Sequence, residues 1–250
     1  MDMKLKADFS ARWRERFGAA ALPVAFFYTD REDGPPVPAN PHRCLIALLF
    51  RAWRGEALRL PAEAIGCAGG KRYAGFAAEL RPDFKYFLSC GIPGRMEGER
   101  YKKSPELVEQ VMARSPKLEA PGRFLVFKPW DALEAGDAPD AAVFLAAPDV
   151  LAGLFTLASF DEAAPDSTIA PFGAGCSAVI THPYLEQRKE RPRCVLGCFD
   201  VSARPFVPKE ALTFAVPMRK LARMCADMDE SFLTTHAWAA VRKRIDAGGK

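Results

Sequence analysis

Two cysteines lie beside glycine-rich segments, in surroundings that suit chemistry at a thiol. Cys67 lies in segment 66–70 (GCAGG), and Cys176 ends segment 171–176 (PFGAGC). Thiolates are preferred ligands of iron–sulfur clusters and zinc, and neighbouring glycines let backbone N–H groups approach the sulfurs of a cluster. We therefore expect a thiolate-ligated metal site that handles a small molecule, most simply an iron–sulfur cluster. The candidate ligands are Cys67, Cys176 and Cys44, with Cys90 and Cys198 as secondary candidates.

The metal ligands would have to come from dispersed segments. No CxxC pair occurs, and the three histidines, His42, His182 and His236, are scattered without an HExxH motif. A zinc-hydrolase site is therefore not indicated. Cys194 and Cys198 are four positions apart; if this segment is a strand, both side chains lie on one face, where they are more often core residues than ligands.

A cysteine nucleophile is the second hypothesis. Cys67 precedes an expected helix N-terminus and lies near Lys71 and Arg72, where positive potential would lower the pKa of its thiol. Cys176 also precedes a helix and could serve as nucleophile or resolving thiol. A general base is missing locally, because His182 could approach Cys176 only through the fold.

A third hypothesis is the binding of an anionic small molecule at segment 69–72. Backbone N–H groups of Gly69 and Gly70 at a helix start, together with Lys71 and Arg72, suit a carboxylate or phosphate. The segment matches neither a Walker A loop nor a GxGxxG fingerprint, so no nucleotide is indicated. In a non-catalytic binding protein the same pocket would hold this ligand and the thiols would only pack.

Helical and strand patterns alternate along the chain, which favours a layered α+β or α/β domain over residues 1–250. The expected helices cover 10–17, 44–54 with Asn40-Pro41 as its N-cap and N1, a stretch starting at 104, 148–157, 177–180, 218–228 and 237–245. The expected strands cover 57–60, 84–88, 24–28, 124–127, 142–146, 195–199 and 212–216. The charged segment 91–103, rich in glycine, is either a lid over a pocket or a solvated connection. Phe172, Phe199, Phe206 and Trp238 are interpreted as core residues.

The two halves of the chain share an order of elements and motifs that suggests an internal duplication. Each has a buried helix, a glycine-rich turn with a cysteine, and a second cysteine 22 or 23 positions later: Cys67 to Cys90 and Cys176 to Cys198. Two quasi-repeated halves, 20–115 and 120–217 followed by C-terminal helices over 218–246, would bring the two glycine-rich loops face to face. Chance similarity between glycine-rich loops is the alternative.

Composition and charge exclude several classes of protein. Hydrophobic residues make up 49% of the 250 residues and charged residues 26%, as in an ordinary globular protein. The 35 basic and 31 acidic residues are mixed, with a net charge of +4, so nucleic acid is not an expected partner. No apolar run is long enough to span a bilayer, and the first residues lack an apolar signal core. We expect a cytoplasmic protein with no membrane partner; the oligomeric state is left open.

Five motifs in order carry a resemblance to a known family. They are 67–73 (CAGGKRY), 96–106 (MEGERYKKSPE), 147–154 (APDVLAGL), 171–176 (PFGAGC) and 196–205 (LGCFDVSARP). Together they resemble the uncharacterised domain-of-unknown-function family 169 over most of the chain. The resemblance implies cysteines at the positions of Cys44, Cys67 and Cys176, whereas Cys90, Cys194 and Cys198 look specific to this member or a subgroup. It implies no activity, because the family has none to transfer.

Overall fold

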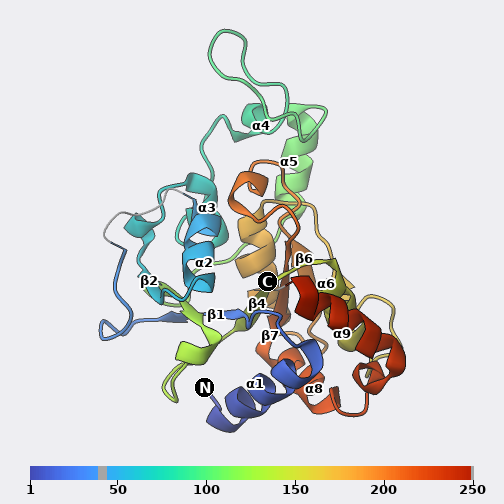
Figure 1. Cartoon of the computed structure of the whole chain (residues 1–250). Helices are drawn as coiled ribbons and strands as arrows, with labels where there is room; N and C mark the ends of the chain where they lie inside the picture. Colours follow the sequence, from blue (N-terminus) through green and yellow to red (C-terminus); the bar gives the residue numbers. More distant parts are fainter. Residues whose placement is uncertain (39–43, 249–250) are drawn as a thin grey trace.

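The computed structural model describes residues 1–38 and 44–248 and places one seven-stranded sheet between two layers of helices (Figure 1). The strands are β1 (Val24–Thr29), β2 (Leu58–Leu60), β3 (Phe124–Pro129), β4 (Ala141–Ala146), β5 (Thr168–Ile169), β6 (Cys194–Gly197) and β7 (Leu212–Pro217). Their order across the sheet is β2-β3-β1-β4-β7-β6-β5. All pairs are antiparallel except β5 with β6, so the sheet is mixed and the fold class is α+β.

Alternation along the central strands divides the core into two. In β1, Val24 and Phe26 face one core, whereas Ala25 and Phe27 face the other. Side chains of a strand point to opposite faces in turn, and both faces here are apolar. A sheet that is apolar on both faces must be covered by helices on both, which explains the three layers.

The first helical layer consists of α1 (Met3–Phe17), α6 (Pro148–Ala158), α8 (Met218–Asp227) and α9 (His236–Gly248). Helix α1 begins earlier than the predicted Ser10, because the Asp2 side chain caps it by accepting from the N–H groups of Lys4 and Leu5. Its aromatic face continues into the core, where the rings of Trp13 and Phe17 stack at 4.1 Å. This layer packs on the face that carries Ala25 and Phe27.

The second layer covers the opposite face and forms one side of the site. It contains α2 (Leu45–Trp53), α3 (Ala68–Tyr73) and the π-helical segment η3 (Ser177–Thr181), which continues into α7 (His182–Glu186). Helix α2 is almost wholly buried, as its continuous apolar run predicts. The predicted N-cap and N1 of this helix, Asn40-Pro41, lie outside the described residues. The 3-10 turns are η1 (Ala62–Ala64), η2 (Trp130–Ala132), η4 (Arg204–Phe206) and η5 (Phe232–Thr234).

Residues 76–118, which we call the excursion, extend beyond this layer and carry α4 (Phe84–Phe87) and α5 (Pro105–Arg114), drawn green in Figure 1. The prediction of a strand at 84–88 is wrong: the Phe87 N–H donates to the Asp83 carbonyl at 3.0 Å, a helical bond. An aromatic run favours strand locally, but here α4 packs against α5 instead. Helix α5 begins as predicted, with Ser104 capping the N–H of Leu107.

The two quasi-repeated halves are not confirmed. Strand β3 lies in the second expected half, yet it pairs with β1 and β2 of the first. Helices α2 and α6, the expected equivalents, pack on opposite faces of the sheet. The similar cysteine spacing therefore has no counterpart in equivalent elements: Cys90 follows a short helix, whereas Cys198 follows a strand.

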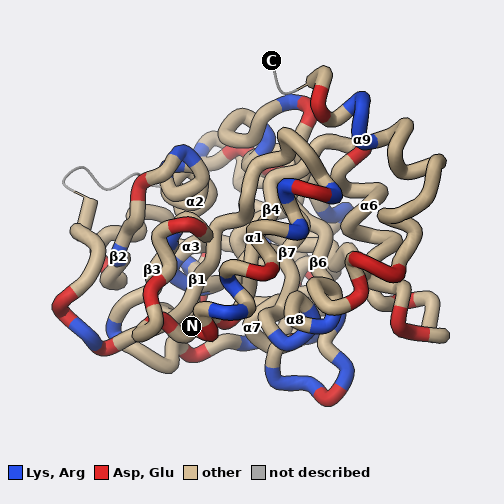
Figure 2. Tube along the Cα trace, turned by 60° about the horizontal axis from the view of Figure 1, so that its bottom comes forward, with Lys and Arg blue, Asp and Glu red and all other residues tan. Residues whose placement is uncertain are grey.

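Charged residues are mixed over the outside of the molecule. Figure 2 shows Lys and Arg interspersed with Asp and Glu along the trace. Within the described residues, no helix is long and apolar enough to cross a membrane.

Candidate functional site

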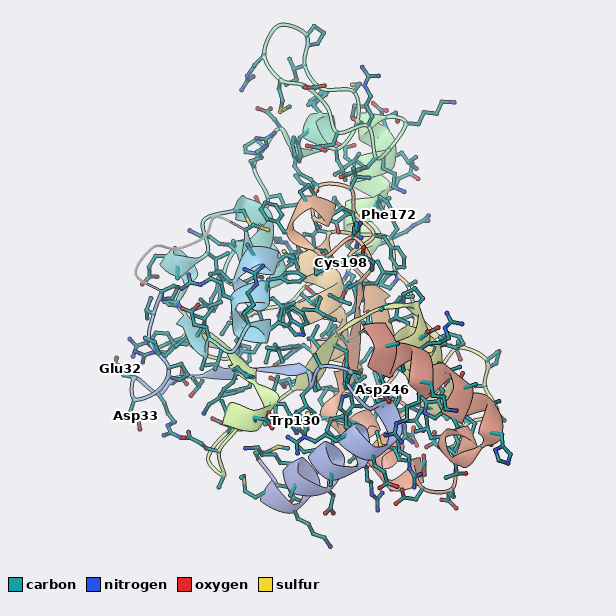
Figure 3. All side chains as sticks on the ribbon, in the orientation of Figure 1. Glu32, Asp33, Trp130, Phe172, Cys198 and Asp246 are labelled. Carbon is teal, nitrogen blue, oxygen red and sulfur yellow. The ribbon has the colours of Figure 1, made fainter. Side chains whose placement is uncertain are left out.

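A cavity of about 760 Å³ lies between the excursion and the body of the protein. Four of the seven cysteines line it, each from a different segment: Cys44, Cys67, Cys176 and Cys198. Figure 3 shows Cys198 and Phe172 in the region where the excursion meets the body. The structure therefore brings together residues that are far apart in the sequence.

Cys67 occupies the N-cap of α3. Its Sγ accepts a hydrogen bond from the N–H of Gly70 at 3.2 Å, so a short helical turn begins at the thiol. A Cβ added to Gly70 would lie 2.7 Å from that Sγ and 3.1 Å from the Cβ of Leu45. Only glycine fits there, because any side chain would displace either the thiol or α2.

Cys176 and Cys44 also lie where helices begin. Cys176 directly precedes the π-helical segment η3 and is 7% exposed, and Cys44 is the N-cap of α2. π-Helical turns are rare and often accompany functional sites. The sequence predicts Cys44 as the first residue of its helix, and the described helix begins one residue later, at Leu45.

Cys198 has an unusual backbone conformation. Its φ of 62° lies in the left-handed region, which non-glycine residues adopt at a cost, and its side chain is 1% exposed. The prediction that Cys194 and Cys198 share a face is wrong. Cys194 packs in the core beneath α8, whereas Cys198 lies past the end of β6, turns to the other side and lines the cavity.

Because Gly175 has no side chain, Cys198 and Asp200 can lie close to the start of η3. A Cβ on Gly175 would lie 3.1 Å from Oδ1 of Asp200 and 3.2 Å from Sγ of Cys198. This Oδ1 is buried and has no hydrogen-bond partner among the described residues. Burial raises the pKa of the Asp200 carboxyl. The close packing explains why position 175 is a glycine.

Burial controls the acidity of the thiols. It raises the pKa of Cys176 well above its usual range, and the nearby Cys67, Cys44 and Cys198 raise it further. Burial also raises the pKa of Cys44 and brings that of Cys198 to about 11. These three thiols are therefore protonated at neutral pH unless a cation stabilises the thiolate.

Of the other predicted site residues, only some line the cavity. Cys90 is exposed on the excursion, outside the cavity lining. Gly69 and Gly70 line the cavity, but Lys71 and Arg72 do not. The arrangement thus separates the two glycines of segment 69–72 from its two cations.

His182 is not in the cavity lining either, and burial lowers the pKa of its imidazole. Among the described residues, the cavity lining therefore contains no histidine base beside Cys176. Among residues 1–38 and 44–248, no group of three or more His, Cys, Asp or Glu side chains is arranged to hold a metal ion.

Aromatic and aliphatic side chains complete the cavity. The excursion contributes Phe84, Phe87 and Met112, and the body contributes Phe172 and Phe199. The interpretation of Phe172, Phe199 and Phe206 as core residues is wrong, since they are 57%, 53% and 45% exposed, whereas Trp238 is in the core as predicted. No local pattern distinguishes an aromatic residue at a cavity rim from one in a core.

Polar contacts hold the excursion against the body. The Tyr101 hydroxyl accepts a hydrogen bond from the Ser202 N–H at 2.7 Å. The Lys102 Nζ lies 3.7 Å from the centre of the Phe172 ring. The cavity is thus bounded on one side by the excursion and on the other by the body.

Fold and site together define a three-layer α+β protein with a cavity lined by four cysteines between the body and the excursion. The family model DUF169, described as "Uncharacterised ArCR", matches residues 14–227, and the chain belongs to this family. No curated protein and no solved structure matches the chain.

Proposed function

We propose that the cavity holds an iron–sulfur cluster bound by Cys44, Cys67 and Cys176, with Cys198 as the fourth ligand, and presents it to a small molecule. The convergence of four thiols from four segments on one cavity is the observation that carries the proposal. Buried cysteines that serve only as small hydrophobic residues have no reason to gather at one cavity. Cys194 and Cys225, which pack in the opposite core, have this simpler role.

A cluster suits the arrangement better than a single ion. The described residues contain no group close enough to ligate one ion, whereas a cluster is larger and separates its thiolate ligands further. Gly69, Gly70 and Gly173 also line the cavity, which leaves room for a cluster and lets backbone N–H groups face its sulfurs. Iron would supply the positive charge that the buried thiols need to ionise.

The state of the cysteines supports a reducing compartment. All seven are free thiols, which is the usual state in the cytosol. We therefore propose a cytoplasmic location.

Anaerobic purification tests the cluster. We expect brown protein that absorbs near ~400 nm and contains iron and acid-labile sulfide. Cys67→Ser and Cys176→Ser should lose colour and iron, whereas Cys90→Ser, whose thiol lies outside the cavity, should keep both. Colourless, iron-free wild-type protein after reconstitution with iron and sulfide, or equal loss in Cys90→Ser, would contradict the proposal.

A cysteine nucleophile at position 67 is the second candidate. The favouring observation is the hydrogen bond from the Gly70 N–H to the Cys67 Sγ at 3.2 Å, which orients this thiol in the cavity lining at the start of α3. In that case iodoacetamide at pH 7 should alkylate Cys67 faster than Cys90, although Cys90 is the more exposed. Faster labelling of Cys90 would exclude this candidate.

A further inference from the structure

We propose that the outer part of the cavity binds a small molecule with an apolar, ring-bearing body and one anionic group. The inference rests on the same cavity as the proposed cluster and names the class of molecule that meets it. It does not require the cluster to be bound, because the residues that carry it come from the excursion and from the rim rather than from the cysteines.

The walls of the outer cavity favour an apolar body. Phe84, Phe87, Val111 and Met112 face it from the excursion, and Phe172 faces it from the body. A volume of about 760 Å³ is in the range of pockets for small organic ligands. Aromatic walls on two sides suit a planar ring, which can stack or meet their edges.

One cation in the cavity lining, and a second that contacts a lining aromatic ring, favour an anionic group. The Arg81 guanidinium lines the cavity, lies 4.5 Å from the centre of the Phe87 ring and donates to Sδ of Met96 at 2.7 Å. Lys102 lies over the ring of Phe172. Within the described part of the chain neither cation forms an ion pair with a carboxylate. A carboxylate or sulfonate on the ligand would supply the missing partner.

Arg81 suits a planar anion better than Lys102 does, since its guanidinium can bind such an anion through two parallel hydrogen bonds. It belongs to the excursion, as do Val111 and Met112. The ligand would therefore touch both the excursion and the body, and its binding would hold the two together alongside the Tyr101–Ser202 hydrogen bond.

Two fluorescent probes test the proposal on the full-length protein. One is anionic, 8-anilinonaphthalene-1-sulfonate, and the other is neutral, N-phenyl-1-naphthylamine. Both should bind saturably at one site in the wild type. Val111→Trp fills the cavity and should weaken both by about tenfold or more. Ala113→Trp, at an exposed position of the same helix outside the cavity lining, should leave both unchanged. Absence of saturable binding, or unchanged binding to Val111→Trp, would overturn the site.

The charge preference has its own test. Arg81→Gln should weaken the anionic probe about threefold, the effect of one exposed charge, and leave the neutral probe unchanged. Arg114→Gln, an exposed arginine of α5 outside the cavity lining, is the matched control. Equal effects of Arg81→Gln on both probes would overturn the anionic group. Cys67→Ser that lacks iron but still binds both probes would separate this site from the cluster.

Discussion

Glu162 should make the protein sensitive to acid, because its carboxylate lies among buried charges. The side chain is 8% exposed; Oε1 is 2.5 Å from Nζ of the fully buried Lys220, and Oε2 accepts from Ser167 and Arg191. Burial by itself raises the pKa of Glu162, but the bonds to Lys220, Ser167 and Arg191 outweigh it and lower the pKa to about 2. Relative to an ordinary value of 4.5, this shift corresponds to roughly 3 kcal/mol of stability.

The sign follows from the direction of the shift. A carboxyl whose pKa is lowered in the folded state stabilises the fold above its unfolded pKa, and this contribution is lost as the pH falls from 4.5 towards 2. Urea unfolding of the wild type and Glu162→Gln between pH 7 and pH 3 measures it. The difference in unfolding free energy should be largest at pH 7 and shrink as the pH falls below 4.5.

The exposed Glu210 provides the control. Glu210→Gln should track the wild type at every pH, because its side chain is 63% exposed and pairs with Lys209, whose side chain is 91% exposed. A constant difference between Glu162→Gln and wild type from pH 7 to pH 3 would refute the reasoning.

Two further predictions concern packing and the excursion. A Cβ on Gly153 would lie 2.3 Å from Cη2 of Trp238 and 2.8 Å from Cε1 of Phe17. Gly153→Ala should therefore lower the unfolding free energy by about 1–3 kcal/mol, although alanine has the better helix propensity. A thermal unfolding scan measures this change, and a more stable variant would contradict the prediction. Tyr101→Phe removes the acceptor of the Ser202 N–H, so amide exchange at Ser202 should accelerate by up to about tenfold while global stability changes little; unchanged exchange would show that this bond does not hold the excursion.

Local patterns were sufficient for most of the elements. Strand β1 lies within a residue of its prediction, and α5 and α6 start at the predicted proline positions. Fixed φ at the first turn, capping by Ser104 and period-two apolar alternation act between neighbouring residues, so a sequence reveals them. The wrong strand prediction at 84–88 has the opposite cause. The aromatic residues there form α4, which packs against α5 and lines the cavity, and these contacts are not local.

The sequence by itself identified Cys44, Cys67 and Cys176, two of them beside glycines, as candidates for one site. It also indicated that the fold would be layered. Only the tertiary structure decided that Cys198 joins them while Cys90 does not. The reason is physical. A spacing of 22 or 23 positions says nothing about distance once the chain folds, and the side to which Cys198 points depends on one left-handed residue past the end of β6. Which side chains line a cavity between two segments depends on how those segments pack, and local sequence patterns do not contain this information.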